Sequence, residues 1–192
     1  MEGGTCFAAI LLLAFTSSCT ARDSATNVGT SVIPMKQLYF FSSLPQMVAT
    51  SDLVITGTVR KTEPGRVMGE GDGAMQFGQV TLSVDRLLFG EIETSTVVIE
   101  ESGLEHGHPS QVGDHGLYFL HQKADAPQFF RLVNSQGRFL DDRNGRLVAL
   151  DDEAAWAKAM ELLSVADLET VIEAAARDVA GGKVPPAKPN LP

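Results

Sequence analysis

The sequence predicts a mainly β domain that is followed by a pair of helices. Between residues 53 and 150, short runs of β-branched and aromatic residues recur, separated by turns that contain glycine. After residue 151 the apolar residues recur every three or four positions, which is the spacing of one helix face. Short, evenly spaced strands favour a small barrel or a sandwich, on which the helical pair would pack.

Seven segments carry strand signals, and they are residues 53–59, 79–88, 96–100, 116–120, 128–133, 138–140 and 146–150. The first is expected to end at Glu63-Pro64-Gly65, and residues 65–78, which hold five glycines, to form a mobile loop. Residues 116–120 are apolar throughout, as in a central strand. Asn144-Gly145 predicts a tight hairpin turn between the last two strands.

Helix signals stand on both sides of the strand region. Before it, Ser43 can cap a short helix that has Pro45 in its first turn. After it, an aspartate at 151 or 152 can cap a helix whose apolar face holds Trp156, Met160 and Leu163.

The last predicted helix starts at Ser164, with Asp167 three residues on as in a capping box. Its apolar stripe consists of Leu168, Val171, Ile172, Ala175 and Val179. Gly181-Gly182 ends it, and the proline-rich residues 183–192 are predicted to be a disordered tail. The helical pair therefore spans residues 151–182.

The amino-terminal segment indicates export. Residues 7–15 form an apolar run that is shorter than the ~20 residues needed to span a bilayer, but suits a signal peptide. Small residues and Cys19 follow, and this arrangement resembles the lipobox of bacterial lipoproteins, in which the cysteine is acylated and the chain is cut just before it. The resemblance implies a signal peptide at 1–18 and a lipidated Cys19 with a flexible tether at 19–36.

An ordinary secretory signal with an incidental cysteine is the alternative. Thr16 stands where a lipobox prefers leucine, and residues 1–6 contain no lysine or arginine. Cys6 and Cys19 are the two cysteines of the chain, so cleavage before Cys19 would leave it without a disulfide partner. The formal net charge of −9 argues against nucleic-acid binding and against electrostatic docking on anionic lipid. Membrane attachment would then rest on the acyl chains.

Four segments carry a second resemblance, and they are 49–59 (ATSDLVITGTV), 81–90 (TLSVDRLLFG), 112–120 (VGDHGLYFL) and 131–139 (RLVNSQGRF). Together they resemble a group of bacterial exported proteins with a netrin-like, or tissue-inhibitor-of-metalloproteinase-like, OB fold. The resemblance implies a small antiparallel OB-like β-barrel over residues 37–150. Those inhibitors chelate zinc through a disulfide-pinned amino-terminal cysteine, and an acylated Cys19 would be unable to act in that way.

The four histidines of the chain lie close together in sequence. His106 and His108 could offer two imidazoles to a metal, with His115 or Glu105 as a third ligand. The alternative is a polar loop that happens to contain imidazoles, because no fixed ligand spacing supports a closed zinc site. His121 is expected to face solvent.

No catalytic site is predicted. The chain lacks a Gly-x-Ser-x-Gly motif, and Ser102 and Ser110 are interpreted as loop residues rather than nucleophiles. The adjacent carboxylates at 100–101, 141–142 and 151–152 would point to opposite faces of a strand, and we expect them in solvated turns and at a helix cap. Residues 69–73 (GEGDG) lack the acidic spacing of a calcium loop.

The sequence thus favours a membrane-anchored cell-envelope lipoprotein that acts as a non-catalytic binding module. Its partner would be an envelope protein or a glycan, contacted through the loops at 63–78 and 102–115, and no cofactor is expected. The alternative is a metal-binding or metal-dependent hydrolytic protein that uses His106, His108 and His115. A purely structural envelope protein is the third hypothesis.

Overall fold

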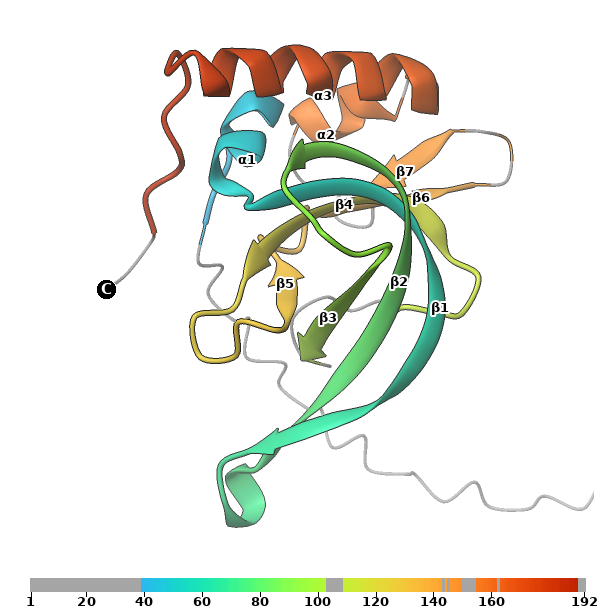
Figure 1. Ribbon diagram of the computed structural model, residues 1–192, viewed down its shortest axis with the longest axis vertical. Coiled ribbons are helices and arrows are strands. Elements are labelled where there is room, and N and C mark those ends of the chain that lie inside the picture. The colour runs from blue at the N-terminus through green and yellow to red at the C-terminus, as the bar shows by residue number, and fades with distance from the viewer. Residues whose placement is uncertain are drawn as a thin grey trace, which may run out of the picture. The chain divides into compact units, whose positions relative to one another are not determined.

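The computed structural model describes residues 39–102, 109–142, 144, 146–149, 155–161 and 163–189, which all belong to one compact unit that starts at Pro34. Within these ranges the chain is mainly β, with seven strands in one sheet and three α-helices, two of them after the last strand (Figure 1). This confirms the predicted class and the carboxy-terminal helices. The predicted signal peptide, Cys19, the tether, His106 and His108 lie outside the described residues.

The elements follow in the order α1 (Leu44–Thr50), β1 (Leu53–Met68), the 3-10 helix η1 (Gly71–Gly73), β2 (Met75–Gly90), β3 (Thr96–Ser102), β4 (His115–Gln122), β5 (Phe130–Leu132), β6 (Arg138–Asp141), β7 (Leu147–Ala149), α2 (Ala155–Met160) and α3 (Val165–Ala180). The strand order is β1-β2-β3-β5-β4-β6-β7, and β1 also pairs with β4. The pairings of β1, β2, β3, β5 and β4 therefore close into a ring, from which β6 and β7 continue. Every pairing is antiparallel except the short parallel contact between β3 and β5.

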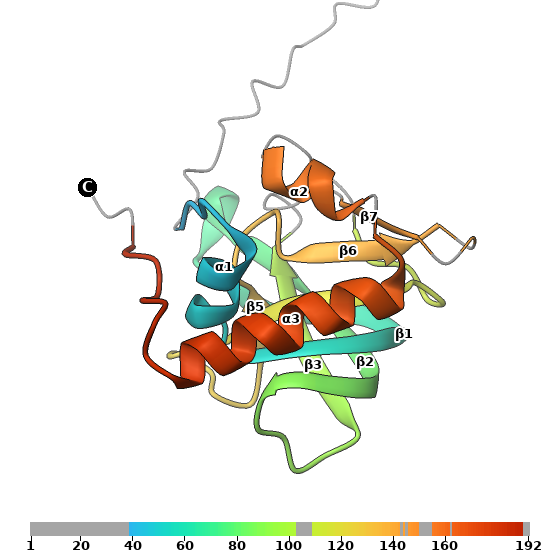
Figure 2. The ribbon, with the colours of Figure 1, turned by 90° about the horizontal axis from the view of Figure 1, so that it is seen from above.

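Two apolar clusters fill the molecule, and the alternation of side chains along the strands separates them. Leu53 and Ile55 of β1 belong to the first cluster, whose buried members all come from the five strands of the ring. Val54 of β1 belongs to the second cluster, which joins the sheet to the helices. Seen from above, α3 runs across the strands beside α1 (Figure 2). Each strand of the ring thus has one face covered by the other strands.

The α3 helix begins as its sequence predicts. The Asp167 N–H donates to Ser164 Oγ at 3.1 Å, and the Ser164 hydroxyl donates back to the Asp167 carboxylate at 2.7 Å. The predicted stripe is confirmed at Leu168, Ile172 and Ala175, which are buried. Val171 was assigned wrongly, because it is 40% exposed on the flank of that stripe. Gly182, with a φ of 70°, lies directly beyond the helix.

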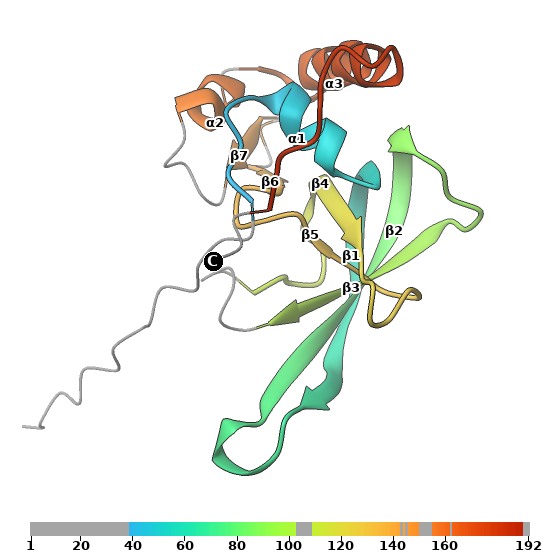
Figure 3. The same cartoon turned by 90° about the vertical axis from the view of Figure 1, so that its left-hand side faces the viewer.

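The predicted end of the first strand at Pro64 is wrong, and so is the mobile loop at 65–78. The β1 strand continues to Met68, and β2 starts at Met75, so a long hairpin with a short tip projects from the sheet (Figure 3). Pro64 is tolerated because β1 pairs with β4 only as far as Thr58, and a register shift follows Pro64. The glycines of this segment serve the tip and the close approach of the two strands.

Two terminal segments of the described chain also differ from their predictions. Ser43 stands at the N-cap of α1 but makes no side-chain cap bond, and the Gln46 side chain instead accepts from the Ser42 N–H at 2.9 Å. Residues 183–189, predicted to be disordered, lie against the domain. Ala187 is buried there, and its N–H donates to Thr50 Oγ1 at 2.8 Å. Burial of Ala187, its backbone bond, and the backbone bond and ion pair of Lys183 with Asp178 hold this segment in place.

Candidate functional site

Two adjacent glutamates on β3, Glu100 and Glu101, are buried. We expected them to be solvated, and that prediction is wrong. The expectation that they point to opposite faces is confirmed by their partners, which are entirely different. A buried carboxylate is stable only with charged and hydrogen-bonding partners, so each glutamate marks a polar site inside this molecule.

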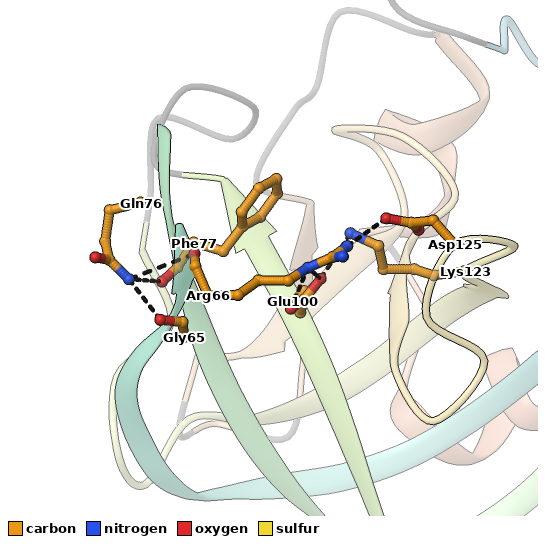
Figure 4. Close-up of polar contacts among 7 residues, drawn as sticks. All are labelled: Gly65, Arg66, Gln76, Phe77, Glu100, Lys123 and Asp125. Carbon is orange, nitrogen blue, oxygen red and sulfur yellow. Dashed lines mark hydrogen bonds and ion pairs between the residues drawn. The ribbon is translucent and has the colours of Figure 1, made fainter. Parts of the chain in front are cut away.

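Glu100 lies at the centre of a four-charge network, here called the Glu100 network, which consists of Arg66, Glu100, Lys123 and Asp125 (Figure 4). Arg66 Nε donates to both carboxylate oxygens of Glu100 at 3.0 Å. Lys123 Nζ lies 2.7 Å from the same carboxylate, and Arg66 Nη2 donates to Asp125. Two cations therefore balance two carboxylates around a Glu100 side chain that has no exposed area.

An aromatic ring covers the two cations of the network. Lys123 Nζ lies 4.6 Å and the Arg66 guanidinium 5.6 Å from the centroid of the Phe77 ring, so both make cation–π contacts with it. Beside them the Gln76 side chain donates to the Gly65 carbonyl at 2.7 Å, across the hairpin (Figure 4). These contacts tie the distal hairpin to β3 and to the connection between β4 and β5.

The Arg66–Asp125 pair of the network favours its charged form. The hydrogen bond from Arg66 holds the pKa of Asp125 below its usual value, and the nearby Lys123 cation acts in the same direction. Conversely, the hydrogen bond to Asp125 raises the pKa of Arg66 further above its usual value. Because both groups favour their charged forms, the Arg66–Asp125 pair acts as a structural contact.

Glu101 belongs to a second group, the Glu101 cluster, which consists of Glu101, Ser110 and Arg138. Ser110 Oγ donates to Glu101 at 2.6 Å, Arg138 Nη1 lies 3.2 Å from the same oxygen, and Arg138 also donates to Ser110 Oγ. Arg138 is 1% exposed, so its guanidinium is buried, and the Glu101 side chain is 11% exposed. Burial raises the pKa of the neighbouring Tyr118, so its hydroxyl stays neutral. The Ser110 hydroxyl is thus a buried hydrogen-bonding group and no accessible nucleophile.

His115 is the one proposed metal ligand among the three histidines that lies within the described residues. Its Nε2 is 3.5 Å from an Asp85 carboxylate oxygen, and its Nδ1 is 3.5 Å from one of Asp141. A pocket of about 270 Å³ lies beside it, lined by Gln111, Val112, Gly113, Asp114, His115, Leu140 and Asp141. In the part of the chain that the structure describes, no group of three or more His, Cys, Asp or Glu residues is arranged to hold a metal ion.

The expected solvent exposure of His121 is only partial. Its side chain is 31% exposed, and Nδ1 lies 2.7 Å from the Asp52 carboxylate. Asp52 also accepts the Gln122 N–H at 2.8 Å, so it fixes the end of β4. His121 therefore has a structural partner on the segment before β1.

Comparison with known proteins found no matching family model and no similar curated protein. Among the described residues, no helix is long and apolar enough to cross a membrane.

Proposed function

We propose that this protein is a lipid-anchored cell-envelope protein that acts as a non-catalytic binding module. In this proposal the ring of five strands is an OB-like barrel, as the resemblance of residues 44–150 to the netrin-like group implies. The closed circuit of pairings among β1, β2, β3, β5 and β4 supports this, because the OB fold is a five-stranded barrel.

The observation that carries the proposal is the Glu100 network. OB folds bind ligands on the face of strands 2 and 3 and through the loops that join strands 1 and 2 and strands 4 and 5. Here the equivalent segments are the β1–β2 hairpin and residues 123–129, and Arg66, Glu100 and Asp125 join them. A projecting segment that is fixed on a rigid scaffold is suited to recognition. The balanced charges of the network and the net charge of −9 favour a protein or glycan partner over nucleic acid.

The anchor has a direct test. The intact mass of the protein purified from membranes should correspond to a chain that starts at Cys19 and carries acyl groups. An unmodified Cys19 would contradict the anchor.

The binding activity has a separate test. The full chain, used to capture proteins from detergent-solubilised envelopes, should return one partner in a stoichiometric amount. The Glu100→Gln variant should return less of it, because the hairpin loses its fixed base, whereas Glu91→Gln, an exposed site, should behave as the parent chain. Recovery of no partner would favour a purely structural envelope protein.

A metal-binding function is the second candidate, and one observation favours it. His115 lies beside the pocket described above, at the end of the segment that carries His106 and His108 in the sequence. Calorimetric titration of zinc and copper into the full chain tests it, with a double His106→Ala/His108→Ala variant as the control. A parent chain that takes up neither metal would eliminate this candidate.

A further inference from the structure

The tip of the β1–β2 hairpin, residues 67–75, exposes large apolar side chains that the fold does not use. Val67 and Met68 are 56% and 46% exposed, and within the described residues neither belongs to an apolar cluster. Consecutive strand residues point to opposite faces, so the tip is apolar on both sides. Exposed apolar groups gathered at one projecting point are typical of an interaction surface.

The same tip carries negative charge. Glu70 and Asp72 are exposed in the turn, and neither makes an ion pair with another described residue. Gly69 and Gly71, with φ values of 88° and 60°, hold this turn in a backbone conformation that other residues rarely adopt. The tip therefore presents two apolar side chains beside two carboxylates.

We propose that the hairpin tip is the contact surface of the binding module, and that its partner is a second protein with an apolar socket rimmed by lysine or arginine. This inference rests on the proposed binding function and names the kind of partner. Val67 and Met68 would enter the socket, while Glu70 and Asp72 would face the basic rim. Complementary charge of this kind sets specificity and the rate of association.

Three other occupants fit the observations less well. Insertion into a membrane would bring Glu70 and Asp72 against an anionic lipid surface, which repels them. A second copy of this chain would carry the same net charge of −9 towards the acidic tip. Pairing of a partner strand with the open edge of β1 is opposed by Lys61 and Pro64, since edge lysine and proline residues disfavour strand addition.

The size of the tip predicts a weak contact by itself, because specific interfaces bury more than about 1,000 Å². A lipid anchor would offset this if the partner lies in the same membrane, since tethering raises the effective concentration. The Glu100 network adds to the affinity by fixing the hairpin before binding, which lowers the ordering cost.

The experiment uses the full, acylated chain in producing cells, with a photo-reactive residue introduced by Met68→p-benzoylphenylalanine. The control is the same change at Val171, which is 40% exposed on α3 and lies outside the hairpin and the 102–115 loop. The expected result is an adduct with a single other protein from position 68 and none from position 171. A Glu70→Lys/Asp72→Lys variant should lower the yield of that adduct about tenfold, and its circular dichroism should match that of the parent chain.

Five results would overturn the inference. These are an adduct of twice the chain mass, an adduct with lipid, equal adducts from both positions, no adduct, and an adduct whose yield the charge reversal leaves unchanged. Failure here is distinguishable from failure of the binding function. If the envelope capture still returns its stoichiometric partner with the Glu70→Lys/Asp72→Lys variant, the module binds through another surface. If the parent chain captures nothing, both proposals fall.

Discussion

Glu100 and Glu101 occupy neighbouring positions on one strand, yet they lie in two very different polar sites. The Glu100 network includes two side chains from outside the core, Arg66 and Asp125, of which Arg66 is 31% exposed. In the Glu101 cluster the arginine is buried, since Arg138 is 1% exposed. Both carboxylates are neutralised by an arginine, and Arg66 also donates to Asp125.

Because side chains alternate between the two faces of a strand, the neighbouring residues Glu100 and Glu101 have different roles. Glu100 joins three segments that are distant in sequence, namely the hairpin, β3 and the β4–β5 connection. Glu101 joins β3 to β6 through the buried guanidinium of Arg138. We therefore expect the first site to control the order of the hairpin and the second to control the stability of the whole domain.

The largest loss of stability is expected when the pair of Glu101 and Arg138 is broken. Arg138→Met leaves the Glu101 carboxylate buried without its cation, which should lower the free energy of unfolding by about 3–5 kcal/mol. Denaturant unfolding measures this, and Arg60→Met, at an exposed position on β1, should change the value by no more than about 0.5 kcal/mol. Equal losses in both variants would show that Arg138 does not balance a buried charge.

Removing the Glu100 carboxylate should lower the free energy of unfolding by a smaller amount. Glu100→Ala should lower the free energy of unfolding by about 2 kcal/mol, because Lys123 loses its carboxylate while Arg66 keeps Asp125. The same unfolding experiment tests it, with the exposed Glu91→Ala as the control. A loss as large as that of Arg138→Met would remove the distinction between the two sites.

The aromatic cover of the network makes a smaller contribution. Phe77→Leu removes two cation–π contacts but keeps an apolar side chain, and should cost about 0.5–1 kcal/mol. Phe77→Tyr retains the ring, so the midpoint of its denaturant unfolding should lie close to that of the parent chain. If leucine and tyrosine behave alike, the ring adds nothing beyond its apolar area.

The smallest effect is the pH dependence of stability that comes from Asp125 in the Glu100 network. Because Arg66 lowers the folded-state pKa of Asp125, this carboxylate stabilises the fold above its usual pKa of 3.8, and the contribution disappears as the pH falls through the lower folded value. Titration of Asp125 by NMR should show a midpoint below 3.8, and Arg66→Gln should raise it. A midpoint at or above 3.8 in the parent chain would contradict the hydrogen bond.

Local patterns in the sequence predicted the strands and the cap of α3 well. The alternation around Val80 and the Ser164 cap depend on near neighbours, which the sequence displays directly. The sequence did not predict the hairpin, because the five glycines within residues 65–78 indicate a loop. The pairing of β1 with β2 is a long-range contact that this composition does not reveal. Turn composition is a weak guide where two strands support each other.

The polar sites were beyond sequence reasoning for a similar reason. Arg66, Lys123 and Asp125 are separated from Glu100 by 23 to 34 positions, and no local pattern joins them. One signal was available, because Glu100 and Glu101 directly follow the apolar run 97–99 and so had to share its burial. What balances a buried carboxylate depends on the strand order, which single-sequence patterns do not specify.

The central claim, that the two glutamates control different parts of the molecule, is tested most directly by amide hydrogen exchange of Glu100→Gln and Glu101→Gln. We expect Glu100→Gln to speed exchange most in the distal hairpin, at 61–68 and 75–79, and much less in β4 and β6. Glu101→Gln should speed exchange throughout β3, β4 and β6. Matching exchange patterns in the two variants, or a hairpin that stays protected in Glu100→Gln, would contradict the account.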